Sequence, residues 1–227
     1  MWAIIKKEFK TYFLSPIGYV VIGILLLTCS LFFYLTTIQS ASVDLGALYF
    51  YAALYGLIIA APILTMRMFS EERKNGTEQL ILTAPISITK VVLGKLIGAL
   101  GVIFVTLLIS FGYFGIISIF GKASIIAVLT SMLGFLLIST SAISLGMFAS
   151  SITENQVISA IITVAFLILS IFVENINSSL SKISIISFYQ KFPVGVISLE
   201  EIAGLVSFSI VFIGLTIIVM QRRKSVK

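Results

Sequence analysis

Long apolar runs separated by short polar stretches dominate this chain. Several of the runs reach the roughly 20 residues that a helix needs to cross a hydrocarbon core about 30 Å thick. The predicted spans cover residues 17–38, 48–69, 87–120, 125–148, 156–173 and 202–220. This pattern predicts an all-α polytopic membrane protein in which residues 1–227 form a single transmembrane domain.

The most prominent polar stretch of the first half, residues 67–95, lies between the second and third spans. Its charged side chains are Arg67, Glu71, Glu72, Arg73, Lys74, Glu78, Lys90 and Lys95. The second span is predicted to continue into water through residues 70–74. Asn75-Gly76 then predicts a helix end, because Gly adopts the left-handed conformation without strain.

A short amphipathic helix is predicted over residues 77–84, with Thr77 as its cap and Glu78 in its first turn. Its apolar side consists of Leu80, Ile81 and Ala84, and it ends before Pro85. Such a helix is too short to cross a bilayer. Held between two spans, it is typical of a docking element for a soluble partner.

Residues 1–15 predict an amphipathic basic helix that lies in the membrane interface. Its apolar side holds Trp2, Ile5, Phe9 and Phe13, and its lysines are Lys6, Lys7 and Lys10. Pro16 ends it. A simple anchor and a helix that also contacts a cytosolic partner both fit this pattern.

Two later polar stretches have distinct patterns. Thr153, Glu154, Asn155 and Gln156 follow the fourth span, and Thr153 and Gln156 have capping-box spacing; capping alone and contact with a partner both remain open. Residues 174–201 contain aromatics, Pro193 and Gly195. They predict short re-entrant helices at the outer interface.

Small residues recur within two spans. Gly94, Gly98 and Gly101 form a row that allows another helix to approach closely. The fourth span is rich in Ser and Gly, which favours close packing over a polar pathway.

The composition supports a membrane protein: 59% of residues are hydrophobic and 11% are charged, against about 25% charged in soluble domains. The net charge of +6 does not indicate nucleic-acid binding, because the basic residues lie at the ends of apolar runs. With both termini inside, twelve of the 15 Lys and Arg residues fall on the cytoplasmic side and three outside, the distribution that the positive-inside rule predicts.

The residue types exclude several chemistries. The chain has no His and one Cys, so it predicts no metal site, no disulfide framework and no catalytic residues of its own. An intramembrane protease built on Glu71-Glu72 lacks a histidine base and an evident Ser–Lys pair. A channel or carrier normally buries charges within its spans, whereas here they lie at span ends.

SEERKNGTEQLILTAPISITKVVLGK resembles the cytoplasmic loop of type-2 ATP-binding-cassette (ABC) exporter permeases, particularly the gliding-motility and nitrous-oxide-reductase-maturation subfamily. KKEFKTYFLSPIGY, SSITENQVISA and FYQKFPVGVISLEEI are similar to other blocks of that subfamily. The resemblance covers essentially the whole chain.

The resemblance implies a permease of the bacterial inner membrane that pairs with a second permease copy or homologue and two cytosolic ATPase subunits, which bind ATP and Mg. The chain itself then needs no cofactor. The ATPase-coupling residues by matching position are Glu71, Glu72, Arg73, Gly76, Thr77, Glu78, Gln79 and Leu80, with Thr153, Glu154, Asn155 and Gln156 as a second contact. An alternative is a non-transporting scaffold that passes ATPase-driven work to an extracytoplasmic partner.

Overall fold

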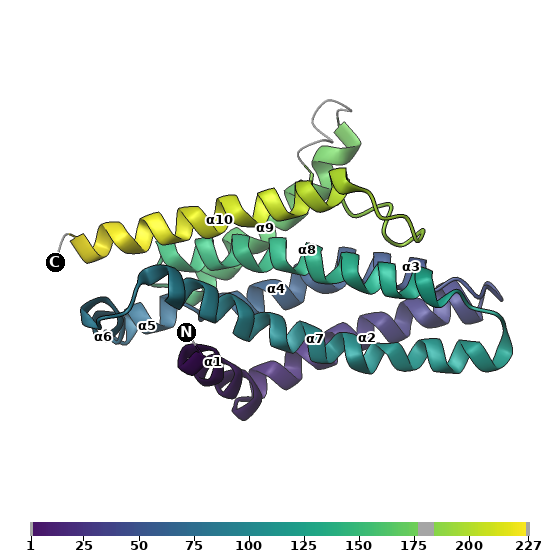
Figure 1. The fold of residues 1–227 in the computed structure, drawn as a ribbon, viewed down its shortest axis with the longest axis horizontal. Helices are drawn as coiled ribbons and strands as arrows, with labels where there is room; N and C mark the ends of the chain where they lie inside the picture. The colour runs from purple at the N-terminus through teal and green to yellow at the C-terminus, as the bar shows by residue number, and fades with distance from the viewer. Residues whose placement is uncertain (1, 177–183, 226–227) are drawn as a thin grey trace.

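The computed structural model describes residues 2–176 and 184–225, and this described part contains helices and turns but no strand (Figure 1). The elements are α1 (Trp2–Leu14), α2 (Pro16–Phe32), the π-helical turn η1 (Phe33–Ile38), α3 (Gly46–Tyr51), the π-helical turn η2 (Ala52–Gly56), α4 (Leu57–Thr65), α5 (Ser70–Lys74), α6 (Glu78–Thr83), α7 (Ile88–Phe120), α8 (Ile125–Ile152), α9 (Gln156–Ile176) and α10 (Leu199–Ser225).

Five helical stretches in the described residues are long and apolar enough to cross a membrane. They are Pro16–Ile38, Gly46–Lys74, Ile88–Phe120, Ile125–Ile152 and Leu199–Ser225. These stretches confirm an all-helical, multi-pass architecture, with ends shifted by a few residues from the predicted spans. The apolar part of α9, Gln156–Phe172, is shorter, so a count of six spans stays a prediction.

The helix that leaves the second span is interrupted, which corrects the prediction of a continuous helix through residues 70–74. Residues 66–69 form a turn between α4 and α5. The Ser150 hydroxyl of α8 accepts hydrogen bonds from the backbone amides of Phe69 and Ser70, each at 3.1 Å. A side chain from a distant part of the chain therefore satisfies donors that a continuous helix would have satisfied internally.

α1 packs against the glycine row of α7. A Cβ added at Gly94 would lie 2.7 Å from the Ile4 side chain, and one added at Gly98 would lie 2.6 Å from the Glu8 side chain. Both distances are shorter than real contacts, so only glycine allows α1 to approach this closely. The structure thus identifies α1 as the helix that the glycine row accommodates.

We expect Gly98→Val to destabilise the protein by about 1–3 kcal/mol, the usual cost of overpacking a close contact. Gly115→Val is the matched control, because no described heavy atom beyond its own helix neighbourhood lies within 4 Å of a Cβ at Gly115. Thermal unfolding of the purified full chain in detergent measures the difference. Equal destabilisation by the two variants would contradict the assignment of the row to α1.

The small residues of α8 pack against neighbouring helices. The Ser141 hydroxyl lies 3.1 Å from the Ser209 hydroxyl of α10 and donates to the Leu205 carbonyl at 2.9 Å. A Cβ at Gly146 would collide with Thr65 of α4. These contacts support the packing interpretation of this serine- and glycine-rich helix.

The described part of the segment before α10, residues 184–198, forms successive turns where short helices were predicted; residues 177–183 lie outside the described residues. Tyr189 and Phe192 are buried, and the segment packs back onto the bundle. Lys191 Nζ and Glu201 Oε1 form an ion pair at 2.5 Å, and this hydrogen bond raises the pKa of Lys191.

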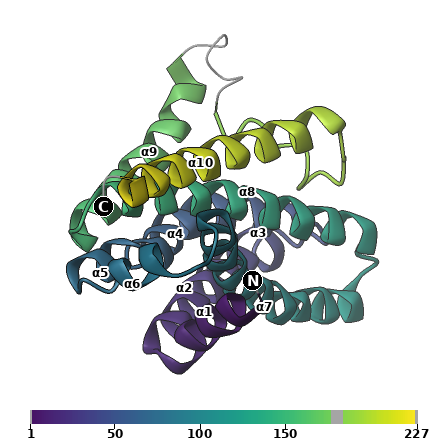
Figure 2. The same ribbon diagram turned by 60° about the vertical axis from the view of Figure 1, so that its left-hand side comes forward.

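The short helices, the loops and the chain ends lie at the two ends of the bundle of long helices. α1, α5, α6 and the C-terminal end of α10 lie at one end, where both described termini also lie (Figure 1), and Figure 2 shows α5 and α6 beside that end of α10. The loop between α7 and α8 and the start of α10 lie at the other end. The basic residues of α1, α5 and α10 are therefore gathered at the end that carries the predicted docking element.

Candidate functional site

The predicted docking element is a short helix suspended between a tight turn and the start of α7. α5 ends at Lys74, and Gly76 follows with φ +72°, in the left-handed region that favours glycine. α6 then covers Glu78–Thr83. The predicted helix end at Asn75-Gly76 is confirmed, and α6 lies within the predicted range 77–84.

Thr77 occupies the position before α6, but its side chain does not act as predicted. Its backbone is helical (φ −71°, ψ −15°), whereas a capping residue is normally extended. The Thr77 hydroxyl instead donates to the Glu72 carbonyl at 3.2 Å. Thr77 thereby satisfies a carbonyl at the end of α5 and fixes the turn between the two short helices.

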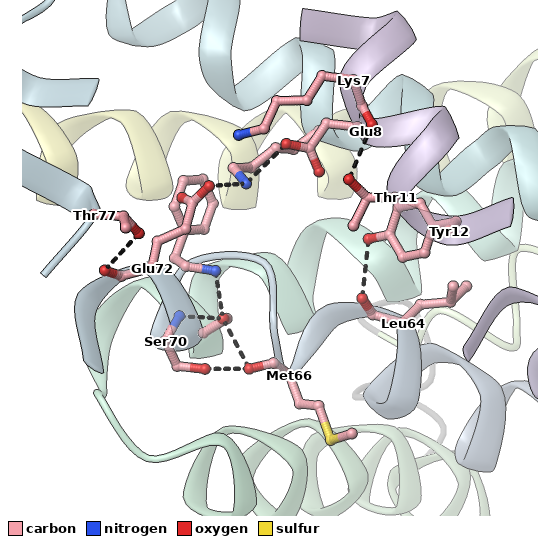
Figure 3. Close-up of polar contacts among 12 residues, drawn as sticks. Lys7, Glu8, Thr11, Tyr12, Leu64, Met66, Ser70, Glu72 and Thr77 are labelled. Carbon is pink, nitrogen blue, oxygen red and sulfur yellow. Dashed lines mark hydrogen bonds and ion pairs between the residues drawn. The ribbon is translucent and has the colours of Figure 1, made fainter. Parts of the chain in front are cut away.

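Lys95 connects α7 to both α5 and α1 through two carboxylates, Glu72 and Glu8, which are labelled in Figure 3. Its Nζ lies 2.8 Å from Glu72 Oε1 and 3.1 Å from Glu8 Oε1, and 5.4 Å from the centre of the Phe69 ring. Lys95 is only 3% exposed and Glu8 is also buried. We call Glu8, Glu72 and Lys95 the ion triad. Because buried charges are costly unless paired, the triad fixes the relative positions of three elements.

Arg73 joins the two predicted contact stretches. Its Nε lies 2.7 Å from Glu154 Oε1, and its guanidinium donates to the Ile152 carbonyl at 3.1 Å. Residues 71–80 and 153–156, separated in sequence by the third and fourth predicted spans, are therefore in contact at this end of the bundle.

The cap of α9 is Asn155, which corrects the capping-box prediction for Thr153 and Gln156. The helix begins at Gln156, so Asn155 is the preceding residue, and its side-chain oxygen accepts from the Val157 amide at 2.9 Å. The Thr153 hydroxyl accepts from the Asn155 amide at 3.1 Å. A shift in the helix start moves the capping role from Thr153 to Asn155.

Asn155→Ala should destabilise the protein by about 1 kcal/mol, the typical cost of removing an N-cap side chain. Thr153→Ala should cost less, because it leaves the capping hydrogen bond to Val157 in place. Thermal unfolding of the two variants side by side tests the assignment. A larger loss for Thr153→Ala would restore the capping-box interpretation.

α6 is held to the C-terminal end of α10 by one arginine. Arg223 pairs with Glu78 at 3.0 Å, and its second terminal nitrogen donates to the Ser151 carbonyl of α8. Glu78 is buried, so it faces the bundle and not the surface. Its predicted place in the first turn is confirmed, but its partner is a cation on another helix.

Several side chains of α6 are exposed, and one of them, Leu80, also borders the cavity near α1. Leu80 is 72% exposed, Gln79 and Thr83 are also exposed, and the side chain of Ile81 lies outside the described residues. Glu71 is half-buried beside the cavity that borders α1. Thus Glu72 and Glu78 form ion pairs with the long helices. The side chains of Leu80 and Gln79 are exposed and available to a partner.

The sequence prediction missed four residues that hold the site: Glu8, Lys95, Ser150 and Arg223. Lys95 carried a signal, since a lysine among apolar residues near the start of a long span requires a counter-charge. Glu8 carried a weaker one, as an acid within a lysine-rich helix. Arg223 and Ser150 gave none, because their roles depend on contacts far along the chain.

The described residues contain no group of His, Cys, Asp and Glu arranged to hold a metal ion. The arrangement can transmit force. A joint displacement of α5 and α6 would act on α7 and α1 through Glu72 and Lys95, on α10 through Glu78 and Arg223, and on the segment before α9 through Arg73 and Glu154. The sequence profile of a family described as "ABC-2 family transporter protein" matches residues 2–208. A comparison with individual curated proteins finds no match.

Proposed function

This chain belongs to the ABC-2 family of transporter proteins, and we propose that it couples ATP hydrolysis by a separate cytosolic ATPase to the export of a substrate. Membership makes it a multi-pass permease component of an ABC transporter that associates with an ABC ATPase. We further propose that the transporter exports its substrate, and that it contains two ATPase subunits, which bind ATP and Mg, and a second permease copy or homologue. We also propose that it lies in the bacterial inner membrane and belongs to the gliding-motility or nitrous-oxide-reductase-maturation subfamily.

One observation carries the coupling proposal: α6 has an exposed leucine, Leu80, at the border of the cavity near α1, while ion pairs of α5 and α6 hold these two short helices to the long helices. Glu78 binds Arg223 of α10, and the preceding α5 binds Lys95 of α7 through Glu72. A partner that binds Leu80 would therefore move α5 and α6 together with the long helices to which they are paired. A flexible loop could not transmit such a displacement.

The proposed orientation places α6 in the cytosol. The basic residues of α1, α5 and α10 lie at the same end as α6, and Lys122 and Lys191 belong to segments at the other end. This distribution follows the positive-inside rule and supports an orientation with both termini on the cytoplasmic side.

In the proposed mechanism this chain performs no covalent chemistry. The ATPase pair changes its global state with nucleotide, and the permease follows because the two states bind α6 in different positions. Such a shift requires a difference in binding free energy between the states. The ion triad and the Arg223–Glu78 pair transmit the displacement of α6 to α1, α7 and α10.

The experiment uses inside-out membrane vesicles containing the permease and its ATPase. ATP should drive uptake of the exported substrate, whereas an ATPase variant that binds but does not hydrolyse ATP should not. The permease should co-purify with the ATPase from the same membranes. Co-purification and ATP hydrolysis without uptake of any candidate cargo would favour the scaffold alternative, and failure to co-purify would reject the coupling role.

A further inference from the structure

A cavity of about 530 Å³ lies beside the ion triad, between α1 and the α4–α6 segment. Ligand pockets in proteins are commonly about 300–1,000 Å³. Its walls change character along its length: Ile17, Ile63 and Leu64 are apolar, while Lys7, Arg67 and Glu71 are charged. An amphiphilic cavity of this kind suits a molecule with a polar head and an apolar body.

The cavity lies where the apolar spans end. Ile17 is at the start of α2 and Leu64 at the end of α4, whereas Lys7 belongs to α1, which precedes the first span. The Tyr12 hydroxyl of α1 donates to the Leu64 carbonyl at 3.1 Å and joins the two walls (Figure 3). The change from apolar to charged walls therefore coincides with the level at which lipid headgroups lie.

The charges of the cavity are balanced. Among the described residues, Lys7, Arg67 and Glu71 form no ion pair with one another or with other groups. Glu72 Oε1 accepts a hydrogen bond from Lys95, but the buried Glu72 Oε2 has no hydrogen-bond partner in the described part of the chain. The cavity thus offers two cations for an anion and a free carboxylate oxygen for a hydrogen-bond donor.

We propose that this cavity binds the headgroup of a zwitterionic phospholipid that carries a primary ammonium group, as in phosphatidylethanolamine. Lys7 and Arg67 bind the phosphate, and the ammonium donates a hydrogen bond to Glu72 Oε2. The apolar walls at Ile17, Ile63 and Leu64 receive the first part of the acyl chains. A choline headgroup cannot donate to Glu72, and a glycerol headgroup carries no positive charge.

The test uses the full-length chain in nanodiscs made from equal amounts of phosphatidylethanolamine, phosphatidylcholine and phosphatidylglycerol. After extraction into detergent, mass spectrometry measures which lipids the protein retains. We expect selective retention of phosphatidylethanolamine. Arg67→Gln and Lys7→Gln should each lower it about tenfold, as the loss of one charge-assisted hydrogen bond predicts.

Lys90→Gln is the matched control, because Lys90 is exposed at the start of α7 and does not line the cavity. It should retain phosphatidylethanolamine at the wild-type level. Glu72→Met removes the acceptor oxygen and should equalise retention of the ethanolamine and choline lipids without changing that of phosphatidylglycerol, a pattern that general unfolding would not produce. Equal retention of all three lipids by the wild type, or no effect of Arg67→Gln and Lys7→Gln, would overturn the proposal. Displacement of the lipid by soluble phosphoethanolamine at equal concentration would assign the cavity to a soluble ligand and overturn it as well.

Discussion

Leu80→Asp should remove most of the ATPase that co-purifies with the permease. Leu80 is 72% exposed on α6, and burying a leucine side chain in an apolar contact contributes about 1.5–3 kcal/mol. Since about 1.4 kcal/mol corresponds to a tenfold change in affinity, the loss predicts roughly ten- to hundredfold weaker association. A buried carboxylate would add a desolvation cost. The measurement is the molar ratio of ATPase to permease after affinity purification from membranes.

Leu199→Asp is the control for this variant. Leu199 is 86% exposed and begins α10, whereas Arg223, which contacts α6, lies roughly 36 Å further along the same helix at 1.5 Å per residue. The same substitution on this even more exposed leucine should leave the molar ratio of ATPase to permease unchanged. If Leu80→Asp kept a stoichiometric ATPase, or if Leu199→Asp lost it equally, α6 would not be the coupling element.

Lys95→Met should destabilise the fold by about 3–5 kcal/mol, because it leaves the buried Glu8 and the half-buried Glu72 close together without a cation. The effect should centre on α1, which depends on α7 for its packing. Thermal unfolding in detergent gives the overall loss, and hydrogen exchange of residues 2–14 gives its location. Lys90→Met, an exposed lysine near the start of α7, should change neither measurement.

The combined variant Glu8→Gln, Glu72→Gln and Lys95→Met separates charge from packing. Replacing a whole buried ion network by neutral groups of similar size is often close to neutral. We therefore expect the triple variant to recover most of the stability that Lys95→Met loses. A triple variant as unstable as the single one would show that the lysine acts through its packing and not through its charge.

Hydrophobic patterning predicted much of the architecture, because each span must bring its own run of apolar residues. The turn at Asn75-Gly76 and the short helix after it were also predictable, since glycine and proline act locally. The interruption at residues 66–69 was not, because it depends on the Ser150 hydroxyl from α8. A local pattern cannot indicate a hydrogen-bond partner so far away in the sequence.

The candidate site was predicted as a set of segments, and its internal connections were not predicted. Arg73 and Glu154 were both expected at the site, yet nothing in their spacing indicated that they form a pair. Lys95 was assigned only to a membrane side by its charge, and its partners Glu8 and Glu72 lie 87 and 23 positions away. The capping prediction failed by two residues, because Thr153 and Asn155 are both good capping residues and only the helix start decides between them.

One lysine shared by two carboxylates gives α1, α5 and α7 a common anchor point. Withdrawing Glu72 from Lys95 would break an ion pair inside the bundle, which is costly, so α5 is expected to move together with α7 and not past it. Because Glu8 is bound to the same lysine, a pull on the short helices would also shift α1 within the membrane interface.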